Sequence, residues 1–300
     1  MSIAIDQLKH NESATQLDLE LDKTHITLFT KMLDTLRAFV PECHFNISEE
    51  GVSLTNLDDT HTVAVMGLLN KAFFTRYIQI KNIDQKETAS TVSTEETSDE
   101  FSINLEELFK ILKSSTRTTS ANLKISPLKI EVTLTGADQR RKSHFNLDTL
   151  QNNDKWDDLS KDIQTNITEY PYQIEISNVD FKEILASIKI FKTELVTLTL
   201  QDDLLTFKHG EHRIDYVLAP QYIDGSDKIL EEPIVTHVIQ GQKISVQLGT
   251  ERLLYLSRAL LISSFTRICI SSEYHPVYFC LQVEDDPHNQ LVVALSPRDG

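Results

Sequence analysis

The sequence predicts an α+β protein made of two similar halves, and three observations support this prediction. Short segments of alternating apolar and polar residues, rich in Val, Ile and Thr, recur along the 300 residues and predict β-strands. Four longer segments show the apolar spacing of amphipathic helices instead. The order of helix, strands, helix and strands recurs from about residue 172, which indicates an internal repeat of a βαβββ-type unit, two copies in each half.

The four helices are expected at residues 24–39, 104–115, 178–191 and 249–264. Each segment has apolar residues three and four positions apart, so one face of each helix can pack on a sheet. Each also begins with a residue type that favours the helix N-cap. These residues are Thr24, Asn104, Asn178 and Thr250.

Twelve strands are expected around these helices, each bounded by a polar turn. They cover residues 52–57, 62–68, 122–125, 129–134, 174–176, 195–200, 203–207, 213–218, 243–246, 267–271, 277–283 and 291–295.

Three polar segments divide the chain into an expected tail, two domains and a linker. Residues 1–16 are expected to form a flexible N-terminal tail, and the Ser-, Thr- and Glu-rich segment 83–100 a polar insertion. Residues 147–171 are polar and acidic but contain isolated Leu159 and Ile163, which is typical of a linker that docks through apolar anchors. The first domain is therefore expected over 17–146 and the second over 172–300.

Composition and missing motifs argue against several functions. The net charge of −16 argues against a nucleic-acid binder with a wholly basic surface, though not against one that gathers its basic residues on one face. No apolar stretch is long enough to span a membrane, and the three cysteines form no CxxC pair, which favours reduced thiols in an intracellular protein.

No catalytic or nucleotide-binding motif is present. The patterns GxxxxGK[ST], GxGxxG, HExxH and GxSxG are all missing from the sequence. His209 and His212 have no further ligands nearby and are interpreted as part of a polar turn. The adjacent carboxylates at 58–59 and 285–286 are interpreted as solvated turns. We therefore expect no enzyme, no metal site and no cofactor.

Several short motifs resemble the proliferating cell nuclear antigen (PCNA) family of sliding clamps. The letters HFNIS at 44–48, EEGVSL at 49–54 and LDDTH at 57–61 follow the family's N-terminal pattern in the same order. FTRY at 74–77, FKILK at 109–113, HPV at 275–277 and LSPR at 295–298 are similar to later family motifs. The resemblance extends over nearly the whole chain.

The resemblance implies a DNA-clamp fold, with two similar domains that each place two helices against antiparallel sheets, assembled into a homotrimeric ring. It implies sequence-independent binding of double-stranded DNA and no catalysis. It also implies that DNA polymerase, the clamp loader, flap endonuclease and ligase-type clients dock through a short peptide motif, in the nucleus or at a viral replication site. The alternatives are a subunit of a heterotrimeric checkpoint-type clamp and an interaction protein unrelated to DNA.

The resemblance implies that basic residues on or just after the four helices face DNA. These residues are Lys31, Arg37, Lys110, Lys113, Arg117, Lys182, Lys189, Lys192, Arg252 and Arg258. Glu183, Ala186 and Leu261 stand at places that are basic in the family, so the basic surface of the last two helices is expected to be shifted or weaker. The alternative is that these cations belong to an ordinary solvated surface.

A partner-peptide site carries over from the family by position. Its residues are Leu57, His61, Thr62, Leu159, Ile163, Pro276, Val277, Ser296 and Pro297. The alternative for Leu159 and Ile163 is that they only dock the linker. The chain departs from the family at Val293 and Ala294, where two tyrosines are usual.

The ring is expected to close by pairing between exposed edge strands of neighbouring subunits. The candidate edges are residues 141–147 in the first half and 195–201 in the second. The residues expected at this interface are Arg141, His144, Phe145, Leu195, Thr197 and Thr199.

Overall fold

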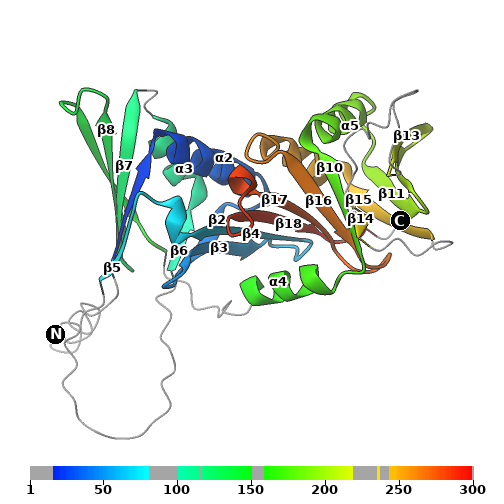
Figure 1. The fold of residues 1–300 in the computed structure, drawn as a ribbon, viewed down its shortest axis with the longest axis horizontal. Helices are drawn as coiled ribbons and strands as arrows, with labels where there is room; N and C mark the ends of the chain where they lie inside the picture. The colour runs from blue at the N-terminus through cyan, green and yellow to red at the C-terminus, as the bar shows by residue number, and fades with distance from the viewer. Residues whose placement is uncertain are drawn as a thin grey trace, which may run out of the picture. The chain divides into compact units, whose positions relative to one another are not determined.

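The computed structural model describes residues 16–80, 101–114, 117–150, 159–218, 235–236 and 243–298. The chain forms two compact units (Figure 1). Unit 1 comprises residues 1–30, 42–54 and 69–155, and unit 2 comprises residues 31–41, 55–68 and 156–300. Residues 1–15 of the expected tail, the whole insertion 83–100 and residues 151–158 of the expected linker lie outside the described residues.

Unit 1 is built on a five-stranded antiparallel sheet with the order β5-β1-β7-β8-β9. Its strands are β1 (Gln16–Asp22), β5 (Arg76–Ile80), β7 (Thr118–Ile125), β8 (Lys129–Gly136) and β9 (Lys142–Asp148). The leucines of β1 alternate with polar residues, and Leu17, Leu19 and Leu21 are all buried, as expected for a strand with one face on the core.

The other elements of unit 1 include three further strands, which follow the order β3-β2-β6. These elements are β2 (Glu42–Ile47), β3 (Gly51–Leu57), the 3₁₀ turn η2 (Lys71–Phe73), β6 (Phe101–Asn104) and the helices α2 (Lys23–Phe39) and α3 (Leu105–Lys113). Helix α2 and strand β3 pass from unit 1 into unit 2. Gly51 is required because an added Cβ would lie 2.1 Å from the carbonyl oxygen of Leu69.

Unit 2 contains two groups of antiparallel strands, with the orders β14-β10-β16-β17-β18-β4 and β13-β12-β11-β15. The first group is β4 (Val63–Asn70), β10 (Tyr172–Ser177), β14 (Val235–Thr236), β16 (Phe265–Ile270), β17 (Val277–Gln282) and β18 (Gln290–Leu295). The second group is β11 (Leu195–Gln201), β12 (Leu204–His209), β13 (His212–Val217) and β15 (Lys243–Gly249).

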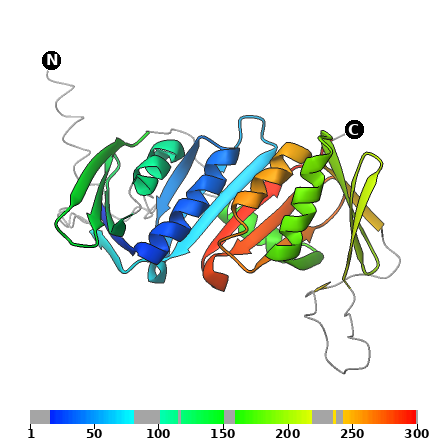
Figure 2. The same ribbon diagram turned by 90° about the horizontal axis from the view of Figure 1, so that it is seen from above.

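The helices of unit 2 cover both faces of the first group of strands. They are α4 (Leu159–Glu169), α5 (Asn178–Ile190) and α6 (Thr250–Tyr255), followed by the 3₁₀ turns η3 (Leu256–Arg258) and η4 (Val283–Asp285). Phe181 of α5 stacks on Phe279 of β17 with ring centroids 6.1 Å apart, so α5 covers the face of Phe279 (Figure 2). Helix α4 packs on the opposite face, against Tyr278 and Val292.

All twelve predicted strands are present, and the four predicted helices correspond to α2, α3, α5 and α6. Asn104 caps α3, as predicted, by accepting a hydrogen bond from the Glu107 amide. Three other cap predictions were wrong. Asp22, rather than Thr24, accepts from the His25 amide at the start of α2; Ser177 rather than Asn178 caps α5; and Gly249 precedes α6 without a side-chain cap.

The predicted edge strand in the second half was also wrong. β11, which carries Leu195, Thr197 and Thr199, lies between β12 and β15 and is paired on both sides. The open edge on that side of the described sheet is β13, whereas β9 ends the five-stranded sheet of unit 1. The amide of Arg298 donates to the carbonyl of Gln247 at 2.9 Å, so the outer edge of β15 is already partly occupied.

Candidate functional site

The predicted DNA-facing cations of α2 and η3 are partly neutralised within unit 2. Asp34 accepts from Arg37 at 2.5 Å and lies 3.4 Å from a guanidinium nitrogen of Arg258. Lys31 donates to the carbonyl of Leu261 at 3.4 Å. One carboxylate therefore serves two guanidinium groups, which lowers the positive potential that this helix surface can offer to phosphates.

Arg252 differs most from its predicted role. Its guanidinium group lies 2.8 Å from Oδ2 of Asp58, whose side chain is only 7% exposed. Arg252 thus binds the loop after β3 instead of standing free for DNA. The interpretation of Asp58 as a solvated turn residue was wrong for the same reason.

The loop of residues 58–62 is built around the Asp58 carboxylate. Its oxygens accept hydrogen bonds from the amides of Thr62 at 2.7 Å and Val63 at 2.8 Å, and from the Thr60 hydroxyl at 2.6 Å. Burial alone would raise the pKa of Asp58, but these hydrogen bonds and Arg252 outweigh it and lower the pKa to about 2. The loop also holds His61 in the left-handed region at φ 54°.

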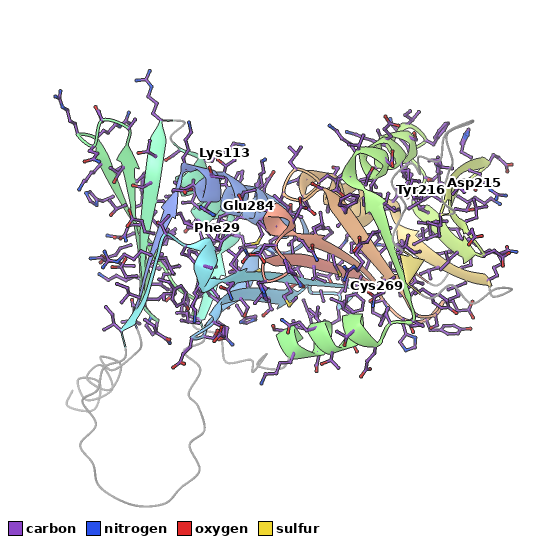
Figure 3. The ribbon with its side chains drawn as sticks, in the orientation of Figure 1. Phe29, Lys113, Asp215, Tyr216, Cys269 and Glu284 are labelled. Carbon is purple, nitrogen blue, oxygen red and sulfur yellow. The ribbon has the colours of Figure 1, made fainter. Side chains whose placement is uncertain are left out.

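The remaining predicted cations lie at the surface. Lys182 and Lys189 on α5 and Lys192 just after it are exposed. In unit 1, Lys110 pairs with Glu106 at 3.1 Å, Lys113 lies 5.0 Å from the ring centre of Phe109, and Arg117 is exposed. Figure 3 shows Lys113 at the end of α3. These exposed groups are the ones best placed to meet a polyanion.

Several predicted peptide-site residues lie together at one end of the β4–β18 pair. The amide of Ser296 donates to the carbonyl of Thr62 at 2.8 Å. Pro297, which follows Ser296, and Leu57, which precedes the loop of residues 58–62, are both half-buried. His61 is exposed in the loop that follows β3. Val277 does not belong to this surface, because its side chain is 0% exposed and shares the α5-covered face with Phe279.

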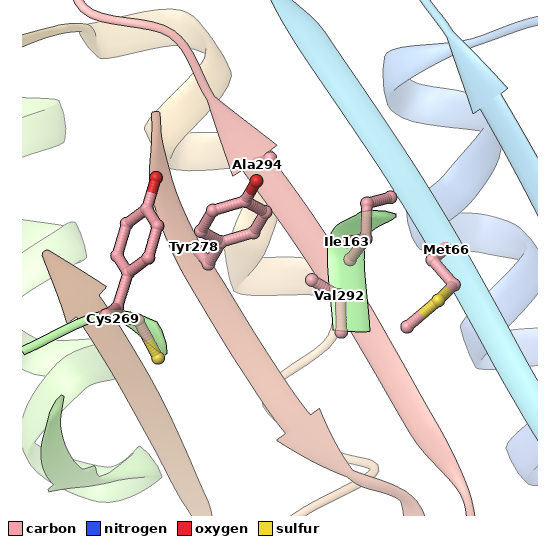
Figure 4. Packing of buried hydrophobic residues seen from close by; sticks show 7 residues of the cluster. Met66, Ile163, Cys269, Tyr278, Val292 and Ala294 are labelled. Atoms are coloured by element: carbon pink, nitrogen blue, oxygen red, sulfur yellow. The ribbon is translucent and has the colours of Figure 1, made fainter. Parts of the chain in front are cut away.

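The linker residues of the predicted peptide site are docked on the sheet. Ile163 of α4 is 2% exposed and packs in a cluster with Met66, Tyr278 and Val292 (Figure 4), while Leu159 packs at its border. The Tyr170 hydroxyl donates to the carbonyl of Pro276 at 2.9 Å. The structure therefore places Ile163 in the role of a linker anchor. Burial, with neighbouring Tyr278, raises the pKa of Tyr170.

Edge strand β13 directs part of its backbone away from β12. The amide of Leu218 donates to the carbonyl of Asp203 at 2.8 Å, so these two residues form a hydrogen-bonded pair. Non-hydrogen-bonded and hydrogen-bonded pairs then alternate along the β12–β13 hairpin. Arg213, Asp215 and Val217 therefore direct their amides away from β12. Tyr216, labelled in Figure 3 beside Asp215, reaches Asp180 of α5 at 3.3 Å. Burial, followed by the nearby Asp180 charge, raises the pKa of Tyr216 to about 12.

The described residues contain no cluster of His, Cys, Asp and Glu suited to a metal ion. No helix in the described ranges is long and apolar enough to cross a bilayer. Asp285, interpreted from the sequence as a solvated turn residue, is exposed, and it also accepts from the amide and hydroxyl of Ser264 at 2.9 and 2.8 Å.

Comparison with known proteins identifies relatives of this chain. The family described as "Proliferating cell nuclear antigen, N-terminal domain" matches residues 17–155. The proliferating cell nuclear antigen of Chaetomium thermophilum is 21% identical over 259 residues, which cover 85% of this chain and 89% of that protein. The matched length extends well past the N-terminal domain and into the second half of the chain.

Proposed function

Since this chain is a divergent member of the PCNA family of sliding clamps, which are not enzymes, we propose that it acts as a replication clamp. Three copies close around duplex DNA, and the ring holds DNA polymerase, the clamp loader and flap endonuclease or ligase-type clients at their substrate. Its place of action is the nucleus, or a viral replication site if the source is a virus.

One observation carries the homotrimer. Among the described residues, β9 ends the five-stranded sheet of unit 1 and β13 ends the four-stranded sheet of unit 2. Pairing of β9 in one copy with β13 in the next is a head-to-tail contact, which closes into a ring when the rotation fits. Identical copies are then sufficient to form the ring. The interface strand of the second half is β13 in this proposal, in place of the β11 predicted from the sequence.

The charge arrangement supports loose contact with DNA. Arg37, Arg252 and Arg258 are each engaged by a carboxylate, while Lys182, Lys189 and Lys192 are exposed. A few exchangeable phosphate contacts carry no sequence information and allow sliding.

The checkpoint-type alternative rests on the departure at Val293 and Ala294 from the family's tyrosines. In that case the chain needs two different partner chains to complete a ring. Light scattering of the purified chain separates the two functions, because a homotrimer has about three times the 34.2 kDa mass of the chain and a checkpoint subunit stays single.

Reversing Lys113, Lys182 and Lys189 together to Glu is expected to weaken binding to duplex DNA. Each lost phosphate contact reduces the magnitude of the slope of log affinity against log salt by roughly 0.9. The slope of the triple variant should therefore be smaller in magnitude by about 2 to 3. Fluorescence anisotropy over a salt series measures this slope.

The matched control reverses Lys124, Lys129 and Lys208, which are exposed on the strands β7, β8 and β12. It changes the net charge by the same amount but is expected to keep the wild-type slope. Equal losses in the two triple variants would show that net charge alone, and not the helix surface, governs DNA binding.

A further inference from the structure

Helix α4 lies on an apolar surface formed by two rows of side chains that cross three strands of unit 2. In one row, Tyr278 of β17 pairs with Ala294 of β18, which pairs with Ala64 of β4. In the other, Cys280 pairs with Val292, which pairs with Met66. The rows lie two residues apart on each strand, so they share one face and form a continuous apolar strip.

Helix α4 meets this strip with aliphatic residues spaced four apart. Leu159, Ile163 and Ile167 occupy one stripe of the helix and all pack against the cluster on the strip. Polar contacts add to the docking, since Ser160 lies 3.6 Å from the Met66 sulfur and Asn166 donates to the Tyr278 hydroxyl at 3.1 Å.

The docking of α4 is shallow for a structural helix. Of the 11 residues of α4, Ile163 has a fully buried side chain, whereas Leu159 and Ile167 are only partly buried. Isolated helices of this length are marginal in water, and the β-branched Thr165 and Thr168 lower the helix propensity further. The conformation of α4 therefore depends on its contact with the strip.

The strip is continuous with the candidate peptide surface. The row of Ala64 and Ala294 is followed, two residues along each strand, by the paired Thr62 and Ser296. At its other side, the hydroxyl of Tyr170, the residue after α4, donates a hydrogen bond to the carbonyl of Pro276. A segment that binds at Thr62, Pro276 and Ser296 and continues over the strip would meet α4.

We propose that α4 is a displaceable internal occupant of the client-binding surface. A client reaches the strip when α4 undocks, and the client segment is an amphipathic helix with aliphatic residues at the same four-residue spacing as Leu159, Ile163 and Ile167. Naming this occupant a client rests on the proposed clamp function, whereas displacement of α4 from the strip does not.

The test compares Ile163→Asp with Gln164→Asp in the full chain. Both variants add one carboxylate to α4, but Ile163 is buried against the strip and Gln164 is exposed. The probe is a labelled peptide with the chain's own sequence 159–170. Removing the docked Ile163 should favour the open strip by roughly ten- to hundredfold, which corresponds to the burial of one aliphatic side chain.

The Ile163→Asp variant should bind the probe roughly ten- to hundredfold tighter than wild type, since the tethered helix no longer competes at its high effective concentration. Its α4 amides should exchange hydrogen faster, while those of β17 stay protected. Gln164→Asp should match wild type in both measurements. A probe peptide that carries the same Ile163→Asp change should not bind.

Equal probe binding by wild type and Ile163→Asp, or no binding by a variant whose α4 amides exchange fast, would overturn the proposal. If Ile163→Asp fails to fold, Ile163→Ala provides the test, and its probe affinity must rise in the same direction by a smaller factor. Loss of DNA binding with an intact probe response would instead count against the clamp function alone.

Discussion

Replacement of Asp58 by alanine is expected to destabilise unit 2 by about 3 to 5 kcal/mol. The change leaves the Arg252 guanidinium group without its carboxylate and removes the acceptor of the Thr62 and Val63 amides. These groups are largely shielded from water, so their lost hydrogen bonds are not fully replaced. Urea unfolding followed by circular dichroism measures the loss.

Asp59→Ala is the matched control, because Asp59 is the exposed neighbour in the same loop. It is expected to change the free energy of unfolding by less than about 0.5 kcal/mol. A similar small effect of Asp58→Ala would show that the Asp58–Arg252 pair does not stabilise the loop.

The contribution of Asp58 should also depend on pH. Its pKa of about 2 in the folded protein lies below the ordinary value of 3.8, so the folded state favours the charged carboxylate. This contribution, about 2 kcal/mol, is fully present above pH 4 and is lost as the pH falls from 4 to 2. The difference in stability between wild type and Asp58→Ala should therefore narrow by about 2 kcal/mol over that interval.

Proline in place of Asp215 is expected to convert the assembled protein into single chains. The Asp215 amide points away from β12, so proline removes a donor from the open edge of β13 without breaking the β12–β13 ladder. Light scattering should report a fall from three chains to one, with circular dichroism unchanged.

Asp215→Ala serves as the control, because it removes the same carboxylate but keeps the amide. It is expected to remain trimeric. Trimers of Asp215→Pro as stable as those of Asp215→Ala would place the interface elsewhere than β13.

Proline at Thr197 or Phe145 does not provide this test. Thr197 lies in β11, which is paired on both sides. The amide of Gly136 donates to Arg141 at 2.9 Å, and Phe145, four residues further along β9, therefore also faces β8. Proline at either position would break a ladder inside the subunit.

Local patterns were enough to predict most elements of the fold. The twelve strands follow from alternating apolar residues, because one face of each strand is buried. Strand β1 was missed although Leu17, Leu19 and Leu21 alternate clearly. β5 and β6 are short, and β6 has the burial pattern of a strand covered on both faces, so alternation gives little signal there.

Helix α4 could not be predicted in the same way. The sequence LSKDIQTNITE is a poor helix former, and its conformation depends on Met66, Tyr278 and Val292, which the fold gathers from distant parts of the chain. Leu159 and Ile163 were identified as anchors, but nothing local indicated which surface they meet.

Pairing between residues far apart in the sequence explains the remaining differences between the predicted and the observed candidate site. Arg252 and Asp58 lie 194 residues apart, and no spacing rule connects them. The position of β11 inside its sheet likewise depends on which strands become neighbours, which the alternation of a single strand does not encode. The basic residues were therefore found, but their carboxylate partners were not.

Closure of this chain around DNA as a ring can be tested on linear duplex DNA with blocked ends. The protein is first threaded over open ends at low salt, and both ends are then capped with a bulky protein. Salt is next raised to about 1 M, where the screening length is about 3 Å and phosphate contacts are suppressed. A ring stays on the capped duplex and leaves when the DNA is cut between the caps. Dissociation from capped duplex as fast as from open duplex would show that the protein does not encircle DNA.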